Sequence, residues 1–600
     1  MQAKIRVGVN PRDPDIIGFA VEFSYNKDTV DAVKNIIGRV FDKRTKSWWI
    51  PLVRYKNLLK LFPVEINFYF PDARNLIDEF EKQGKKVEFL WNLPVDYDLE
   101  LPIKIYNGEP SRFQKIDSAI MAWHKYGCII NGSEMGVGKT LEALMSSEIL
   151  IEEGKINKTI IVCPASIKLT WFSEINNWFP NRVKDTFVIS GNKNKRISIL
   201  EKAKMHAGIT YIVINYDLVG TSAEMGQTLD DNKDSNLIAI LNIVDKKTLL
   251  ICDEIHKLKN LSANRTSGVW RIRKKVKHII GLSGTPMKNN PFDLYSISKL
   301  MDEGIFGSKR NFEERFIDYD ITGRMKLKNE DHLRNCFSHF FIRRRKEEVM
   351  PWLPPKTHVN HYIELTTAQK IMYKDARDKF IIFLLSGDIV SINNIMTQIL
   401  RFKQITASTH LLDPESPTNS GKLNYLEELL EDIIAESNEK VVVFSYFRGM
   451  IEEVMSRFAK FNPVMIMGAM SESKKEDSKY KFNEDDNCKL LAMTSSGTEG
   501  LNLQKKCSTM IFLDKMWVPG DNDQGEDRLH RRGQTKPVTI IDMMATIDGE
   551  NTVDYKIEQV LLRKRKWFNA LINDANGGLL KKIREDSSMK EIKSIVEELI

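Results

Sequence analysis

Short runs of apolar residues recur along the chain, separated by longer segments with the apolar spacing of helices. Strands that are buried on both faces are almost continuously apolar, so such runs predict parallel sheets covered by helices. The first half contains the runs Thr159–Val162, Tyr211–Ile214, Leu249–Cys252 and His278–Ile280. The second half contains Val441–Phe444, Val464–Met467, Leu490–Met493, Met510–Leu513 and Val538–Met543. The two series predict an α/β protein with two parallel-sheet lobes.

A helix-rich stretch, roughly residues 305–420, separates the two series. Thr367–Phe383 and Ile392–Ile405 have the 3.6-residue spacing of helices, and prolines cluster at residues 351–355 and 414–417. These features predict helical insertions and a linker between the lobes. The expected domains are an N-terminal unit (1–65), a linker (66–104), lobe 1 (105–345), a linker and helical insertion (346–420), lobe 2 (421–570) and a helical C-terminal tail (571–600).

The composition is that of an ordinary soluble globular protein, with 42% hydrophobic and 28% charged residues among 600. The net charge of +8 is compatible with one basic groove and excludes a histone-like protein. None of the six cysteines is in a CxxC pair, which argues against a structural zinc site. With no signal-peptide pattern and no membrane-length apolar run, we expect a monomeric intracellular protein without a membrane partner. It would be cytoplasmic and nucleoid-associated in a bacterium or phage, and nuclear in a eukaryote.

A phosphate-binding loop follows the first strand-like segment. Cys128–Ile130 runs into SEMGVGKT, residues 133–140, and then into a helix-forming segment. Glycines in such a loop let backbone N–H groups face phosphate oxygens at a helix N-terminus. Lys139 would reach the β- and γ-phosphates of ATP, and the Thr140 hydroxyl would bind Mg²⁺. The expected nucleotide contacts are Glu134, Met135, Gly136, Val137, Gly138, Lys139 and Thr140.

Two carboxylates follow the apolar run Leu249–Cys252. Asp253 and Glu254 would then lie at the carboxyl edge of the sheet, beside the phosphate loop. Asp253 is expected to bind Mg²⁺ through water, and Glu254 to orient and deprotonate the attacking water. An acidic pair after a strand is common, and only its combination with the phosphate loop makes it a strong signal.

Further motifs resemble those of superfamily two helicases, in particular the Swi/Snf branch. DEIH at Asp253–His256 and LSGTPMKNN at Leu282–Asn290 are similar to two first-lobe motifs. DQGEDRLHRRGQ at Asp523–Gln534 is similar to the branch's sixth motif, QxxxRxHRxGQ. The resemblance covers roughly residues 105–565 and implies two RecA-like lobes. It assigns adenine reading to Gln114, and it assigns coupling of the ATP state to DNA contact to Ser283, Thr285, Gly500, Trp517 and Gln524.

Arg528 and Arg531 are three residues apart in the sixth motif. On a helix they would share one face. The resemblance implies that they act as arginine fingers on the γ-phosphate when the lobes close, so hydrolysis would need both lobes. A pair of arginines is more often a solvated basic surface, but here the surrounding motif favours the catalytic interpretation.

The same resemblance suggests where DNA would lie. Polar groups at strand ends can bind the phosphate backbone without reading bases, which suits movement over any sequence. The residues implied are Pro164, Ser166, Asn215, Tyr216, Thr494 and Ser495. Ser495 departs from the branch, where arginine is common at this position, and this difference puts one phosphate contact in doubt.

Residues 1–65 form a separate basic unit, with twelve Lys and Arg against seven Asp and Glu, a net charge of +5. RVFDKRTKSWWIPL predicts a hairpin with a basic tip, where Lys43, Arg44, Lys46 and Trp48 combine phosphate contact with base stacking. The segment is similar to the HARP module of HepA-related annealing helicases, which implies a small α+β domain. The alternative is a structural cap in which Trp48 and Trp49 are core residues.

These features together predict an ATP- and Mg²⁺-dependent motor of the Swi/Snf branch, closest to HARP-type annealing helicases. The expected partner is double-stranded or forked DNA, which the protein would remodel or reanneal. One alternative is a remodeller that strips protein, such as RNA polymerase, from DNA. A non-catalytic DNA clamp is opposed by the intact Lys139, Asp253 and Glu254, and an RNA helicase is disfavoured by the sixth motif and Trp517.

Overall fold

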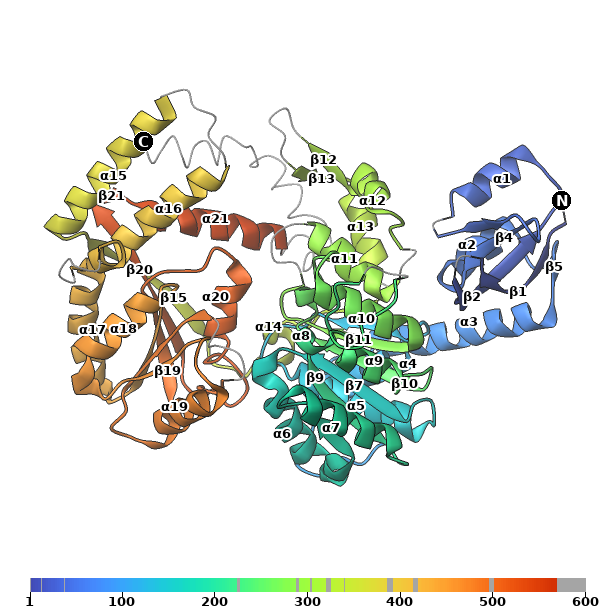
Figure 1. Ribbon diagram of the computed structural model, residues 1–600, viewed down its shortest axis with the longest axis horizontal. Helices are drawn as coiled ribbons and strands as arrows, with labels where there is room; N and C mark the ends of the chain where they lie inside the picture. Colours follow the sequence, from blue (N-terminus) through green and yellow to red (C-terminus); the bar gives the residue numbers. More distant parts are fainter. Residues whose placement is uncertain are drawn as a thin grey trace. The chain divides into compact units, whose positions relative to one another are not determined.

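The computed structural model describes residues 2–568 apart from 12, 37, 224–226, 287–290, 303–304, 320–324, 339, 386–391, 414–418 and 496–500. The chain forms two compact units (Figure 1). Unit 1 comprises residues 1–134 and 138–349, and unit 2 comprises residues 135–137 and 350–600. No helix in the described part of the chain is long and apolar enough to cross a bilayer.

Unit 1 begins with a small α+β module built on a five-stranded sheet in the order β3-β4-β2-β1-β5. Its strands are β1 (Lys4–Asn10), β2 (Asp13–Glu22), β3 (Val40–Asp42), β4 (Ser47–Pro51) and β5 (Phe68–Tyr69). Its helices are α1 (Lys27–Lys34), α2 (Tyr55–Leu61) and α3 (Pro71–Trp91). Val33, Leu58 and Phe19 belong to its apolar core.

This sheet extends past residue 65, into the segment that we expected to be a linker. β5 pairs in parallel with β1, and Tyr69 and Ala73 are buried in the module's core. β5 is only two residues long, so the sequence pattern gave no strand signal there. Residues 66–80 therefore belong structurally to the N-terminal module, whereas Val87 and Leu90, near the end of α3, belong to the apolar core of the lobe that follows.

The rest of unit 1 is an α/β lobe around a parallel sheet in the order β14-β6-β11-β10-β7-β9-β8. The strands are β6 (Cys128–Asn131), β7 (Lys158–Cys163), β8 (Thr186–Val188), β9 (Thr210–Asn215), β10 (Thr248–Asp253), β11 (His278–Leu282) and β14 (Phe341–Ile342). The helices are α4 (Arg112–Trp123), α5 (Lys139–Glu152), α6 (Lys168–Trp178), α7 (Lys193–Met205), α8 (Tyr216–Val219), α9 (Ser235–Leu241) and α10 (Asn264–Lys275). All four apolar runs of the first series are strands, as predicted.

A mostly helical segment follows β11. It contains α11 (Pro291–Met301), α12 (Lys309–Phe316), α13 (Glu330–Ser338) and α14 (Lys346–Val349), with an antiparallel pair, β12 (Ile317–Tyr319) and β13 (Met325–Leu327). Phe306, Phe312 and Phe316 are buried and their rings contact one another, which makes a small aromatic core. The segment between β11 and unit 2 thus has a small apolar core of its own.

Unit 2 is built on a second parallel sheet, in the order β15-β20-β19-β16-β18-β17, with β21 antiparallel to β20. Its strands are β15 (Lys356–Glu364), β16 (Lys440–Phe444), β17 (Val464–Ile466), β18 (Leu490–Met493), β19 (Cys507–Phe512), β20 (Val538–Ile547) and β21 (Glu550–Asn551). Its helices are α15 (Thr367–Leu385), α16 (Ile392–Ala407), α17 (Gly421–Ser437), α18 (Arg448–Arg457), α19 (Glu472–Glu484), α20 (Pro519–Glu526) and α21 (Val553–Phe568). The predicted fold class, with two parallel-sheet lobes and an N-terminal α+β domain, is confirmed.

β15 is the main element of this lobe that the apolar pattern missed. It lies in the expected linker and insertion, yet it pairs with β20 over nine residues. It is an edge strand, and most of its side chains are polar and exposed. A strand with one free edge and solvated side chains has no continuous apolar run to reveal it.

Candidate nucleotide site and DNA-contact residues

The turn between β6 and α5 has the backbone geometry of a phosphate-binding loop. Gly136 and Gly138 have φ angles of +84° and +102°, in the left-handed region that favours glycine. A side-chain carbon at Gly138 would lie 2.1 Å from Nε2 of Gln114, so space as well as backbone angle requires glycine here. Lys139 is the first residue of α5, and the helix N-terminus therefore faces the loop.

Ser133 occupies the position where the general phosphate-loop pattern has its first glycine. It is buried and is not among the residues with positive φ, so its backbone does not need glycine. Its amide donates to Oδ1 of Asn131 at 3.0 Å, and its hydroxyl accepts from the amide of Arg344 at 3.1 Å. The serine therefore ties the loop to the segment after β14.

Lys139 points back over the loop. Its Nζ donates to the carbonyl oxygens of Ser133 and Glu134 at 2.8 and 3.0 Å. Burial lowers the pKa of Lys139 to about 8, although the nearby Glu254 carboxylate acts to raise it. A buried cation lies where the loop would receive phosphate, and part of its charge is lost just above neutral pH.

We expect ATP affinity to weaken as the pH rises above about 8, because Lys139 then loses its proton in the free protein. ATP phosphate favours the charged lysine, so binding takes up a proton above that pH and loses up to about tenfold in affinity per pH unit. Titration of a fluorescent ATP analogue between pH values of about 7 and 9.5 measures this. Lys139→Ala should bind more weakly but without the decline, and an unchanged decline in that variant would assign it to another group.

The acidic pair ends β10, as predicted. Asp253 is the last residue of the strand, and its Oδ2 accepts from Nε1 of Trp171 at 2.8 Å. Burial, and then the charge of Glu254, raises the pKa of Asp253 to about 7. Burial and the neighbouring charge disfavour ionisation of Asp253, and a divalent cation would offset both effects, so the two carboxylates fit a divalent cation site. The described residues contain no group of three or more His, Cys, Asp or Glu side chains that could hold a metal ion.

Glu254 is connected through His256 to Ser283, in the motif expected to couple ATP state to DNA contact. The Glu254 backbone is left-handed, with φ of +50°, and its Oε2 lies 3.1 Å from Nδ1 of His256. The same imidazole nitrogen lies 2.9 Å from the hydroxyl of Ser283, which also accepts from the amide of Thr285 at 3.2 Å. The structure therefore brings together the acidic pair and the two first-lobe residues, Ser283 and Thr285, of the five that we expect to couple ATP state to DNA contact.

Gln114 lies beside the phosphate loop, on α4. It is 2% exposed, its Oε1 accepts from the amide of Ser111 at 2.9 Å, and its amide nitrogen faces Gly138. On the same helix the buried Asp117 accepts three hydrogen bonds from the guanidinium of Arg344. Sequence reasoning missed this pair, and the only available signal was the arginine-rich IRRRKEE segment.

Arg528 and Arg531, in the second lobe, lie on turns and not on a helix. α20 ends at Glu526, and the amide of Arg531 donates to the carbonyl of Leu529, a spacing no helix uses. The prediction that both arginines share a helix face is therefore wrong. Gly533, with φ of +95°, and the hydrogen bond from His530 Nε2 to the carbonyl of Pro354, at 2.8 Å, hold the chain in this shape.

Arg531 is held by the loop that precedes β19. Its Nη1 donates to Oδ1 of Asn502 at 2.5 Å and to the carbonyl of Leu501 at 3.3 Å. Of the second-lobe residues expected to couple ATP state to DNA contact, Gln524 is buried on α20 and Trp517 packs against an apolar cluster that includes Phe402. Gly500 lies outside the described residues.

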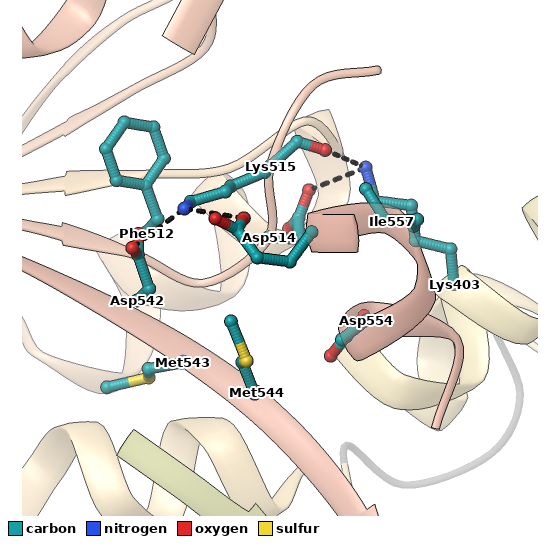
Figure 2. Close-up of a pocket in the computed structure, with 10 residues that line it drawn as sticks. Lys403, Phe512, Asp514, Lys515, Asp542, Met543, Met544, Asp554 and Ile557 are labelled. Carbon is teal, nitrogen blue, oxygen red and sulfur yellow. Dashed lines mark hydrogen bonds and ion pairs between the residues drawn. The ribbon is translucent and has the colours of Figure 1, made fainter. Parts of the chain in front are cut away.

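A small cavity of about 20 Å³, lined by both charged and apolar side chains, lies in the second lobe (Figure 2). Its volume fits about one water molecule, so it is not a nucleotide site. Lys515 reaches Asp542 at 2.7 Å and Glu558 at 2.9 Å, and Lys403 lies 3.5 Å from Asp514. These contacts tie α16 and α21 to the end of β19 and to β20.

The first-lobe residues expected to contact DNA lie at the carboxyl ends of strands. Pro164 follows β7, with Ser166 two residues later, and Asn215 ends β9. Tyr216 is different, because it is 2% exposed and its hydroxyl donates to the carbonyl of Asp253 at 2.7 Å. The expectation of a phosphate contact by Tyr216 is therefore corrected: its side chain supports the acidic pair.

In the second lobe the expected DNA contacts follow β18. Thr494 is buried and comes directly after the strand, and Ser495 is half-buried. The amide of Thr494 donates to the carbonyl of Ile466 at 3.3 Å, which fixes the strand end against β17. The residues that continue this segment, 496–500, lie outside the described part of the chain.

The N-terminal module contains the predicted hairpin. β3 and β4 pair antiparallel, with Asp42 opposite Ser47 at the turn. Lys43, Arg44 and Lys46 are exposed at the tip. Since Asp42 Oδ1 accepts from the amide of Arg44 at 2.9 Å, the tip has a defined conformation.

The two tryptophans of the hairpin have different environments. Trp49 is 3% exposed, and its Nε1 donates to the carbonyl of Gly8 at 3.1 Å. Trp48 is half-buried against the module's core, and its ring centre lies 5.0 Å from that of Phe41. Phe41 is 44% exposed. Trp48 is therefore less open than we expected, and Phe41 adds a second ring beside it.

Family models match the three parts of this chain. The SNF2-related domain matches residues 43–412, the helicase conserved C-terminal domain matches residues 421–533, and the HepA-related protein (HARP) domain matches residues 19–63. The first match alone covers more than half of the chain.

Similar proteins are named as a DNA helicase, a DNA repair and recombination protein and a SWI2/SNF2 ATPase core. The probable ATP-dependent DNA helicase CHR23 of Arabidopsis thaliana is 28% identical over 73% of this chain and 40% of its own length. A DNA repair and recombination protein RAD54-like of Drosophila erecta is 26% identical over 75% of this chain and 60% of its own. The SWI2/SNF2 ATPase core of Sulfolobus solfataricus, solved with double-stranded DNA, is 25% identical, with a TM-score of 0.38 over 84% of this chain and 99% of that one. The chain thus spans less than two thirds of the lengths of CHR23 and of the RAD54-like protein.

Proposed function

The chain belongs to the SNF2-related family, and from this premise we propose that it is a DNA-stimulated ATPase that moves along duplex DNA. The observation that carries the proposal is the arrangement around the phosphate loop. The charges of Glu254 and Asp253 act on the pKa of Lys139, and those of Glu254 and Lys139 act on the pKa of Asp253, so the three groups lie close together. Glu254 is also connected to Ser283, so the hydrolytic group and the coupling motif form one unit.

ATP would bind with its phosphates over the loop and Lys139. The Thr140 hydroxyl and the Asp253 carboxylate would hold Mg²⁺, which neutralises phosphate charge when bound. Glu254 would accept the proton of the attacking water. Arg528 and Arg531 would approach the γ-phosphate when the second lobe closes, which makes hydrolysis depend on lobe movement.

DNA would contact backbone-binding residues at the strand ends, namely Pro164, Ser166, Asn215, Thr494 and Ser495. Such contacts are indifferent to sequence, as movement along DNA requires. The N-terminal hairpin would add a preference for forks or junctions, because its basic tip suits phosphates and the Phe41 and Trp48 rings suit an unpaired base. Reannealing or remodelling at such structures is the outcome that we propose.

The test compares ATP hydrolysis and DNA affinity on single-stranded, duplex and forked DNA. Duplex DNA should stimulate ATP hydrolysis, and RNA added as a competitor of the duplex should not stimulate it. The triple variant Lys43→Ala, Arg44→Ala and Lys46→Ala should keep duplex-stimulated hydrolysis but bind forked DNA more weakly. For this variant, the slope of log affinity for forked DNA against log salt concentration should also become shallower, by about 0.7 to 0.9 for each phosphate contact removed.

A matched control removes the same charge from the same module. Lys27, Lys56 and Lys60 are exposed and lie outside the hairpin, and their triple alanine variant should bind forked DNA normally. Equal losses on duplex and forked DNA would overturn the junction-reading role. Absence of any ATP hydrolysis, with DNA binding intact, would instead identify a non-catalytic clamp.

A further inference from the structure

Glu526, the last residue of α20, carries a carboxylate that is completely buried among cations. Its Oε2 lies 2.7 Å from Nζ of Lys356 and 3.3 Å from Nε2 of His358, both on β15. Its Oε1 lies 3.7 Å from Nη2 of Arg565, on α21. Burial alone would raise the pKa of Glu526, but Lys356 and His358 hold it well below its usual range. The side chain is therefore a charged anchor between two elements.

This anchor lies directly before the turn that carries the two arginines. Asp527 follows Glu526, and Arg528 comes next. The backbone carbonyl of Glu526 accepts from the amides of Leu529 and His530, at 3.0 Å in each case. A shift of Glu526 would therefore be transmitted to the turn through both the chain and these hydrogen bonds.

The cations around Glu526 are themselves held by further charges. Arg565 also pairs with Asp523, one turn earlier on α20. His358 lies 3.4 Å from Asp542, which pairs with Lys515 at the cavity of Figure 2. The Glu526 carboxylate is fully buried, and leaving a buried charge without its partners is costly, so these pairs favour one arrangement of β15, α20 and α21.

We propose that Glu526, clamped by Lys356 and Arg565, is a positioning residue that orients the turn of Arg528 and Arg531 for ATP hydrolysis. This inference rests on the proposed function, in which those arginines act on the γ-phosphate. It assigns a role to α21 as well, because Arg565 connects that helix to the turn. Glu526 itself need not contact the nucleotide, because its role is to fix the positions of Arg528 and Arg531.

The experiment measures kcat and KM for ATP with saturating duplex DNA. Glu526→Gln keeps the shape of the side chain and removes its charge, and Arg565→Gln removes one clamp from a partly exposed position. Both should lower kcat by about 10-fold or more, since small displacements of catalytic groups can cost up to about 100-fold. The KM for ATP should stay within about threefold, because the loss falls on the transition state.

Three further variants separate positioning from general damage. Arg565→Lys keeps the positive charge and should retain most of the activity. Arg448→Gln is the matched control, because Arg448 pairs with Glu452 at an exposed position of the same lobe, and it should leave kcat unchanged. Adding Glu526→Gln to the variant that already carries Arg528→Ala and Arg531→Ala should cause no further slowing, since Glu526 acts through those two arginines.

The outcomes distinguish this inference from the proposed function. Normal turnover in Arg531→Ala would overturn the arginine role and the clamp with it. Impaired Arg531→Ala together with normal Glu526→Gln and Arg565→Gln would overturn only the clamp, as would a further loss when Glu526→Gln is added to the variant that lacks both arginines. Thermal unfolding of each variant is measured in parallel. If Glu526→Gln fails to fold, Arg565→Gln and Arg565→Lys decide the result.

Discussion

Replacing Arg531 with alanine should lower the rate of ATP hydrolysis by about 10³-fold while changing ATP affinity far less. An arginine finger stabilises charge that develops on the transferred phosphoryl group, and this charge is small in the ground state. The structure adds a reason to expect little folding cost, since the contacts of Nη1 are with Asn502 and the carbonyl of Leu501 on a neighbouring loop.

Single-turnover hydrolysis and nucleotide titration measure these two quantities separately. Asn502→Ala is an informative control, because it removes the side chain that holds Arg531 without removing the arginine. It should change the rate far less than Arg531→Ala does. If ATP affinity fell in step with turnover, Arg531 would be an ordinary ground-state ligand of the nucleotide.

Replacing Glu254 with glutamine should trap bound ATP. The amide keeps the size of the side chain but cannot accept the water's proton, so turnover should fall by at least about 100-fold. ATP binding should survive, because the proposed phosphate contacts come from the loop and Lys139. The measurement is the release of phosphate in a single turnover, beside equilibrium binding of a nucleotide analogue.

His256 offers the control for this second prediction. It contacts both Glu254 and Ser283 but is not expected to take the water's proton. His256→Ala should therefore hydrolyse ATP faster than Glu254→Gln and should respond less to DNA, because it interrupts the connection to the coupling motif. Near-normal turnover in Glu254→Gln would mean that another group activates the water.

The strands of both lobes were predictable because they are buried on both faces. A run such as Leu249–Cys252 has to be apolar throughout when helices cover each side of the sheet. The phosphate loop was predictable for a related reason, since its backbone angles demand glycine at fixed positions. Gly136 and Gly138 both have the left-handed angles that this requires.

Elements at edges and turns were less predictable. β15, an edge strand, is polar because most of its side chains are exposed, and β5 is too short to have a pattern. The helix expected to carry Arg528 and Arg531 ends early because His530 and Gly533 hold the chain in turns. Local spacing cannot reveal such an ending, since the partner of His530 is 176 residues away.

By itself the sequence determined the fold class, the family and the types of residue at the ATP site, because glycine positions, strand-end carboxylates and apolar runs are local requirements. Only the tertiary structure decided which of the candidates are buried and what each contacts. It turned Tyr216 from a presumed DNA contact into a support for Asp253, and it brought Glu526 into contact with Lys356, 170 residues away. Such pairings depend on which strands are neighbours, and hydrogen bonds and ion pairs between neighbours leave no periodic trace in the chain.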